Sequence, residues 1–304
     1  MKVEDILSGG RHRHKWRSPK RRSRIVGPNL HPNIKLKEGG SLDGVGAIHI
    51  DEIEPTLRAL EKTLGVPLVG NTLGSVGKKE FSGDIDIALK MDPKDTAEFV
   101  KRLEDSPLTD EVQKSSVIMT RTKIVNYDEG IETDKERTGY VQIDFMPSDD
   151  VDWLKTYYHA PHEKDSKYKG ALRNIAVAII AKYVDPKASE ETTPDGRPME
   201  SERYMLSPRD GLVRVRRTPV PKKSGDGYTK QNKNDIIGGP WKTGDEIAKQ
   251  LRLGSAADLD SFETVFAAIE KNHGEDVAAK VAADFARDNT VQSLGVPDEL
   301  EKYL

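Results

Sequence analysis

Residues 73–89 read LGSVGKKEFSGDIDIAL, and this stretch decides how the rest of the chain is interpreted. The Gly74-Ser75 pair is followed, after eight residues, by Asp84 and Asp86 with an isoleucine between them. In a β-strand successive side chains point to opposite faces, so the two aspartates share one face while the isoleucines face the core. Carboxylates held in this way suit Mg²⁺, which completes its shell with water and phosphate oxygens. The stretch therefore predicts half of a phosphoryl-transfer site.

Two further segments predict the other half. Residues 66–69 indicate a short strand, and Gly74-Ser75 is expected to lead into a helical turn whose free N–H groups and hydroxyl bind a phosphate. Asp144 lies within VQIDFM, residues 141–146, with apolar neighbours on both sides. A charge in such surroundings is costly unless a metal or a partner compensates it. Asp144 is therefore expected to be a third carboxylate beside the first two.

This order of motifs resembles the polymerase-beta-type nucleotidyltransferase superfamily, which has a Gly-Ser pair, an Asp-x-Asp on one strand and a lone Asp on a later strand. The resemblance covers about residues 50–185, and the matching positions are Gly74, Ser75, Asp84, Asp86 and Asp144. It implies a nucleotidyltransferase core of mixed or antiparallel sheet with flanking helices. It also implies two Mg²⁺ ions, with Mn²⁺ as an alternative, held by the three aspartates as metal ligands and catalytic residues.

The same resemblance implies how the triphosphate of the NTP is bound. Ser75 and the N–H groups around it would bind the β- and γ-phosphates, and a helix after the third carboxylate would supply a cation. Lys169 and Arg173 are the candidates, because residues four apart lie on one face of a helix. Ordinary solvated charges are the alternative interpretation. Gly77-Lys78-Lys79 is not a P-loop, since that motif needs a glycine five residues earlier and Ser or Thr after the lysine.

The composition indicates a polar protein without a membrane span. Hydrophobic residues make up 35% and charged residues 33% of 304 residues, and the longest apolar run, residues 175–181, is far too short to cross a bilayer. The first residues, MKVED, do not form a signal peptide. The absence of cysteine excludes disulfides and thiolate zinc sites, and fits a reducing compartment. The expected location is therefore cytoplasmic, with no membrane partner.

The charges are unevenly distributed. Residues 1–40 contain eleven Lys or Arg against three acids, although the whole chain has a net charge of -3. Such a basic arm attracts phosphate backbones, and an aromatic ring in it can stack on an unpaired base. The residues expected to contact nucleic acid there are Arg13, Lys15, Trp16, Arg17, Arg21 and Arg22. A solubilising tail, or an arm that wraps the body, is the alternative.

Three regions and an α+β fold are predicted. Residues 1–47 form the basic N-terminal arm and linker, 48–230 the catalytic domain and 231–304 a C-terminal helical domain. Helices are expected at 51–64, 93–104, 149–158, 168–183, 245–253, 259–271, 276–287 and 297–304. Hairpins are expected from strands 116–127 and 139–146, and within 203–217. Arg214 and Arg216 lie in a second basic stretch that predicts nucleic-acid contact, with a loosely ordered loop as the alternative.

The expected function is Mg²⁺-dependent transfer of a nucleoside monophosphate from an NTP, ATP among them, to an acceptor hydroxyl with release of pyrophosphate. The 3′ end of RNA is the first choice of acceptor because of the two basic stretches. Two alternatives remain open. In the first, the acceptor is a small molecule, a protein side chain or a second nucleotide, as in the synthesis of a nucleotide messenger. In the other, the fold is catalytically inactive and binds nucleic acid.

Overall fold

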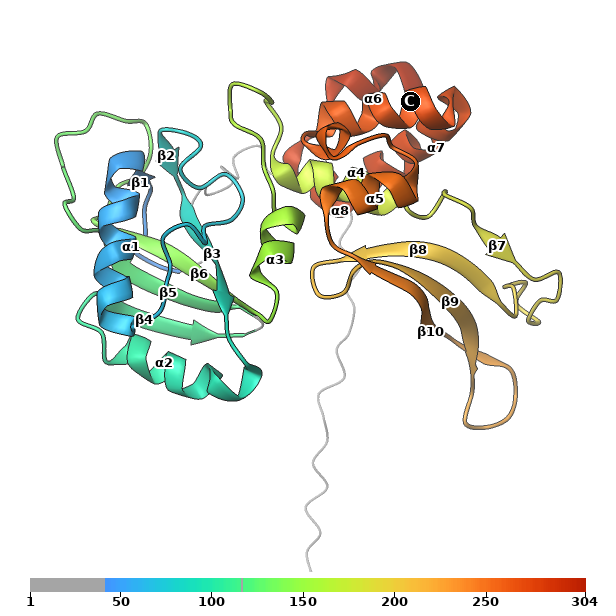
Figure 1. Ribbon diagram of the computed structural model, residues 1–304, viewed down its shortest axis with the longest axis horizontal. Coiled ribbons are helices and arrows are strands. Elements are labelled where there is room, and N and C mark those ends of the chain that lie inside the picture. The colour runs from blue at the N-terminus through green and yellow to red at the C-terminus, as the bar shows by residue number, and fades with distance from the viewer. Residues whose placement is uncertain (1–41, 116) are drawn as a thin grey trace, which may run out of the picture. The chain divides into compact units, whose positions relative to one another are not determined.

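The computed structural model describes residues 42–115 and 117–304, which belong to one unit running from Glu38 to Leu304 (Figure 1). Its mixture of helices and sheets confirms the α+β class. The first sheet has the strand order β3-β6-β5-β4. Its strands are β3 (Asp84–Lys90), β4 (Thr109–Lys114), β5 (Ile118–Lys123) and β6 (Tyr140–Ser148).

The pairing within this sheet confirms one prediction and adds a strand. β5 and β6 form the expected antiparallel hairpin, and β6 pairs in parallel with β3. β4, which pairs with the other edge of β5, was not predicted. Its sequence TDEVQK is mostly polar, because an edge strand with exposed side chains lacks the alternation that reveals a half-buried strand. The strand expected at residues 66–69 is absent, since this segment is irregular and leads into a turn.

One hydrophobic core lies between this sheet and two helices. Helices α1 (Ile50–Leu64) and α2 (Thr96–Glu104) cover the same face of the sheet (Figure 1). The buried side chains that meet there include Leu57, Leu60, Phe99, Ile85, Ile87, Ile143 and Phe145. Each contributes about 1.5–3 kcal/mol when it is removed from water. This core leaves the opposite face of β3 and β6 for the aspartates.

Local signals set the ends of α1 as the sequence predicts. His49 Nδ1 accepts a hydrogen bond from the N–H of Asp51 (3.3 Å), and Glu52 Oε2 accepts one from the N–H of His49 (3.0 Å). Together they satisfy two donors that the first turn leaves free. The helix ends at Gly65, whose φ of 68° is open to glycine at little cost. Ahead of α1, β1 (Ile48–His49) pairs with β2 (Phe81–Ser82), and η1 (Pro93–Asp95) precedes α2.

A second core joins the middle of the chain to its C-terminal part. Helices α3 (Val151–Tyr157) and α4 (Gly170–Ile180) are followed by a sheet of order β10-β9-β8-β7. Its strands are β7 (Lys187–Ala188), β8 (Ser201–Ser207), β9 (Gly211–Pro221) and β10 (Tyr228–Trp241). Then come α5 (Gly244–Leu251), η2 (Ala256–Leu259), α6 (Phe262–His273), α7 (Glu275–Ala286), α8 (Asn289–Leu294) and η3 (Asp298–Tyr303). In the described part of the chain, no helix is long and apolar enough to cross a membrane.

The two cores divide the chain differently from the predicted domains. Trp153, Ala176 and Leu212 pack in one cluster with Phe262 and Phe285 of the C-terminal helices. The expected boundary at residue 230 falls inside β10. The polar sequence of β10 hides this strand, because most of its side chains are exposed and it is held by backbone pairing with β9. α4 and the second sheet therefore pack with the C-terminal helices. α3 packs on both sides, because its Trp153 belongs to this cluster whereas its Leu154 packs against Ala88 of β3.

Candidate active site

The three predicted carboxylates lie on one face of two neighbouring strands. The parallel register of β3 and β6 places Asp86 opposite Asp144 and Asp84 opposite Gln142. Residues two apart in a strand share a face, so all three aspartates lie on the face opposite the buried isoleucines. The structure thus brings together residues that are up to 60 positions apart in the sequence.

Burial and mutual repulsion make this cluster electrostatically unfavourable without a cation. Burial raises the pKa of Asp86 to about 7, with further contributions from the charges of Asp84 and Asp144. Burial also raises the pKa of Asp84, against the opposing charges of Lys79 and Lys169. The pKa of Asp144 is raised by burial as well, although a hydrogen bond from Gln142 Nε2 to its Oδ1 (2.8 Å) acts in the opposite direction. Like charges held together in this way are typical of functional sites.

The donor set fits a hard divalent cation. Carboxylate oxygens on two adjacent strands are the ligands that Mg²⁺ and Mn²⁺ prefer. Among residues 42–115 and 117–304, no group of three or more His, Cys, Asp or Glu side chains is already arranged around a metal position. The fit therefore rests on the chemistry of the three carboxylates, their shared face and their raised pKa values.

The metal-free protein is expected to lose stability as the pH rises from about 5 to about 8. The pKa of Asp86 is about 7 in the folded protein, against an ordinary value of 3.8. Between these two pKa values the folded state holds a proton that the unfolded state has released, and this proton stabilises the folded state. The stabilisation is complete below pH 3.8 and is lost as the pH rises through about 7. Thermal unfolding in EDTA across this range measures the effect. In Asp86→Asn the melting temperature should depend less on pH.

Adding Mg²⁺ at pH 8 should reverse this loss, since a ligand that binds only the folded state raises its stability. The melting temperature of the wild type should rise with Mg²⁺ concentration, and that of Asp144→Ala should rise much less. A wild-type melting temperature that increases with pH in EDTA, or that does not change when Mg²⁺ is added at pH 8, would contradict the interpretation of the aspartates as a cation site.

The Gly74-Ser75 turn lies directly beside Asp86. Leu73 N donates to Asp86 O (2.8 Å), and a Cβ placed on Gly74 would lie 3.9 Å from Asp86 Oδ2. Gly74 has a φ of 64°, a conformation that favours glycine. The expected helical turn is not formed, because residues 75–77 make a hydrogen-bonded turn that does not continue as a helix. Gly74 N already donates to Tyr158 O (3.0 Å), so Ser75 is the better-placed donor for a phosphate.

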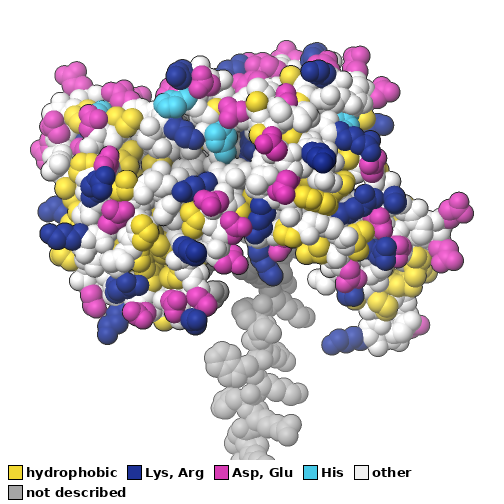
Figure 2. All heavy atoms as spheres, viewed as in Figure 1, with side chains coloured by type: hydrophobic (Ala, Val, Ile, Leu, Met, Phe, Trp, Pro, Cys, Tyr) yellow, Lys and Arg dark blue, Asp and Glu magenta, His cyan; other side chains and the backbone are white. Residues whose placement is uncertain are grey.

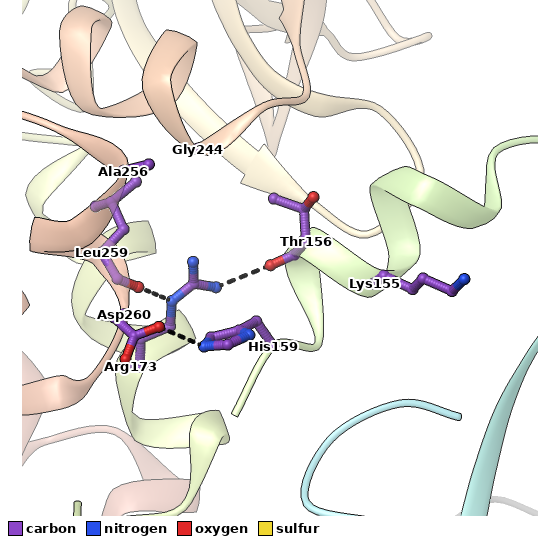
Figure 3. Close-up of a pocket in the computed structure, with 8 residues that line it drawn as sticks. All are labelled: Lys155, Thr156, His159, Arg173, Gly244, Ala256, Leu259 and Asp260. Carbon is purple, nitrogen blue, oxygen red and sulfur yellow. Dashed lines mark hydrogen bonds and ion pairs between the residues drawn. The ribbon is translucent and has the colours of Figure 1, made fainter. Parts of the chain in front are cut away.

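The structure separates the two predicted phosphate-binding cations. Lys169 lies close enough to Asp84 to oppose the rise in its pKa, as predicted for a cation near the cluster. Arg173 is 6% exposed, and its Nε donates to Leu259 O (2.6 Å) while Nη1 donates to Thr156 O (3.2 Å), as Figure 3 shows. The prediction that Lys169 and Arg173 share one face of a helix is wrong, because Lys169 is the extended N-cap residue of α4 rather than part of the helix. Arg173 thus joins α4 to α3 and to the η2 end, and its contact with a phosphate stays a prediction.

Sequence reasoning missed three residues of the site. Lys79 lies close enough to Asp84 to influence its pKa, but it was set aside with the rejected P-loop. Gln142 could have been found by its position two residues before Asp144 on the same face. Tyr158 has a pKa raised by burial, by Tyr157 and by Asp86, and nothing in the sequence marks it as a neighbour of that aspartate.

The predicted nucleic-acid contacts are only partly described. The six arm residues from Arg13 to Arg22 lie outside the described residues. Arg214 and Arg216 are on β9, where both form ion pairs with Glu202 (3.3 and 3.0 Å), and Arg216 forms another with Glu200 (3.2 Å). Their charges are therefore largely neutralised by neighbours on β8, which the sequence alone does not indicate.

Comparison with known proteins adds no further evidence about the site, since no protein-family model and no curated protein matches the chain. The interpretation of the aspartate cluster therefore depends on its own geometry and chemistry.

Proposed function

We propose that the protein is a Mg²⁺-dependent nucleotidyltransferase that moves a nucleoside monophosphate from an NTP to an acceptor hydroxyl and releases pyrophosphate. The observation that carries this proposal is the register of β3 and β6, which sets Asp86 against Asp144 with Asp84 on the same face. The raised pKa values of all three aspartates support it, because such a cluster calls for cations.

Each group has a role that follows from its position. When bound by the three aspartates, Mg²⁺ would neutralise the triphosphate and make the acceptor hydroxyl more acidic. The hydroxyl and N–H of Ser75 would donate to phosphate oxygens. Lys79 and Lys169, which lie near Asp84, would add positive charge where the pyrophosphate leaves. Asp144 would accept the proton of the acceptor hydroxyl, whose acidity a bound Mg²⁺ would raise.

The first choice of acceptor is the 3′ hydroxyl of RNA, which the basic arm of residues 1–40 would attract. One observation favours a small-molecule acceptor instead. The ion pairs of Arg214 and Arg216 with Glu200 and Glu202 compensate the charges of these two arginines. On the face shown in Figure 2, basic and acidic side chains are interspersed rather than gathered by sign.

The test supplies both kinds of acceptor. Purified full-length protein is incubated with Mg²⁺, each of the four NTPs labelled at the α-phosphate, and either mixed cellular RNA or a pool of small metabolites. Asp144→Ala is the matched negative control. We expect label in an acceptor with the wild type alone, and the nature of the labelled product identifies the acceptor.

The salt dependence separates the two acceptors further. Transfer to RNA held by a basic arm should fall steeply as salt is raised, whereas transfer to a small molecule should change little. Transfer of the label by the wild type and by Asp144→Ala at the same rate would contradict the role of the cluster. The absence of label in every acceptor would favour the alternative of a non-catalytic, nucleic-acid-binding fold.

A further inference from the structure

The Gly74-Ser75 turn rests on a short segment that follows α3. Gly74 N donates to Tyr158 O (3.0 Å), and Gly74 pairs with His159 as an isolated parallel bridge. Lys78, at the end of the same turn, donates through Nζ to Ala160 O. The start of the turn is held against β3 by the hydrogen bond from Leu73 N to Asp86 O, and the contacts with residues 158–160 hold its other side.

Residues 158–160 are held on another side by the C-terminal half of the chain. His159 Nε2 donates to Asp260 Oδ1 (2.7 Å), the hydrogen bond drawn in Figure 3. Asp260 follows η2 and precedes α6. The start of α4 also packs closely here, since a Cβ on Gly170 would come within 2.7 Å of His159 O. Two contacts therefore connect the Gly-Ser turn to the C-terminal part of the chain: Gly74 contacts residues 158–159, and His159 contacts Asp260.

Asp260 is the acidic partner of several cations at this point. His159 faces Lys78, Arg173 and Asp260, and its pKa is lowered by burial and by Lys78 while Asp260 acts in the opposite direction. Burial lowers the pKa of Lys78 too, again against the charge of Asp260. Without this carboxylate, Lys78 of the turn and Arg173 of α4 would lose a nearby compensating charge, and His159 would lose its hydrogen-bond acceptor.

The contact between His159 and Asp260 is open to solvent, so its effect on overall stability is small. The side chains of His159 and Asp260 are 36% and 52% exposed, and they border a pocket of about 300 Å³ that Arg173 also lines (Figure 3). Exposed pairs of this kind add little to the free energy of unfolding. A local role can therefore be tested without unfolding the protein.

We propose that Asp260 is a positioning residue for nucleotide binding: through His159 it holds residues 158–160 in place, and these in turn hold the Gly74-Ser75 turn against Asp86. This inference rests on the proposed function, and it gives the C-terminal helices a part in the reaction without contact with the substrate. The residue acts on the turn that binds phosphate rather than on the metal ligands.

The direct test is hydrogen exchange of the full-length protein over peptides that cover residues 73–80. Asp260→Ala should speed exchange there at least about fivefold, the usual lower limit of coupling between sites. Asp260→Asn, which keeps an acceptor oxygen of similar reach, should restore much of the protection. Glu270→Ala is the matched control, since Glu270 forms an exposed ion pair with Lys302 (3.0 Å) on the same helices.

A kinetic measurement distinguishes positioning from general damage. Asp260→Ala should raise the KM for NTP about fivefold or more while changing kcat less, and Glu270→Ala should leave both unchanged. Unchanged exchange at residues 73–80 in Asp260→Ala, or an equal change in Glu270→Ala, would overturn the inference. If exchange changes as expected but the wild type transfers no nucleotide, the proposed function fails and the link from Asp260 to the turn stands.

Discussion

Replacing Asp86 by asparagine should abolish nucleotidyl transfer while leaving the protein at least as stable as the wild type. Asp86 is the centre of the cluster, since its pKa is raised to about 7 by burial and by both neighbouring aspartates. Asparagine has the same size but lacks the charge that a divalent cation requires. Removing one preorganised electrostatic contact typically lowers kcat by about 10²–10³-fold, and loss of the central carboxylate should cost at least as much.

The stability of this variant makes the prediction specific. Asparagine removes the repulsion that Asp86 exerts on two neighbouring, partly buried carboxylates, so the melting temperature at pH 8 in EDTA should stay equal or rise. Asp149→Asn is the control, because Asp149 is an exposed carboxylate just beyond the end of β6. It should keep full activity. Loss of both activity and fold in Asp86→Asn would indicate a structural role for the aspartate.

Replacing Arg137 by alanine should destabilise the first sheet and its helices by about 3–5 kcal/mol, which is typical for a buried charge that loses its partner. Arg137 and Glu52 are joined by two hydrogen bonds of 2.7 and 3.1 Å, and their side chains are only 6% and 4% exposed. Glu52 also accepts from the N–H of Asp128 (3.0 Å). Burial tends to raise the pKa of Glu52, but the hydrogen bonds, that of Arg137 foremost, outweigh it and lower the pKa. Alanine would leave this carboxylate buried without its cation.

Urea unfolding followed by circular dichroism measures this change. Arg58→Ala is the matched control, because Arg58 pairs with Glu54 on the exposed side of the same α1 helix, with both side chains 61% exposed. That variant should change the free energy of unfolding by no more than about 0.5 kcal/mol. A loss below about 1 kcal/mol in Arg137→Ala would show that the pair is not the buried anchor described here.

The carboxylates could be predicted from the sequence because they lie in strands with strong alternation. The pattern Asp84-Ile85-Asp86 fixes one face by itself, and the apolar neighbours of Asp144 mark a second strand. Asp144 was expected beside Asp86, and the register of β3 and β6 places it there. In both cases the signal is local, since a strand with one buried face must alternate.

The sequence did not reveal contacts between distant residues. Arg137 lies in the charged loop of residues 128–138, to which no role was given, and its partner Glu52 is 85 positions away. Arg173 was expected at the phosphates, yet it joins α4 to Thr156 and Leu259. Charged side chains follow no periodicity that shows which partner they will meet, so their roles depend on how the elements pack.

The sequence also did not show that residue 230, the expected domain boundary, lies inside β10, for a related reason. β10 carries mainly exposed polar residues and is held by its pairing with β9, so no apolar alternation marks it. The helices from α5 to α7 were predicted correctly because each has an apolar face at helical spacing.

The measurement that tests the account most directly is the analysis of both products formed from an NTP labelled separately at the α- and γ-phosphates. Wild-type protein with Mg²⁺ should release pyrophosphate that carries the γ label and place the α label in an acceptor, in equal amounts. Asp86→Asn should do neither. Release of inorganic phosphate with formation of the nucleoside diphosphate would contradict the account, because it would show cleavage between the β- and γ-phosphates rather than nucleotidyl transfer.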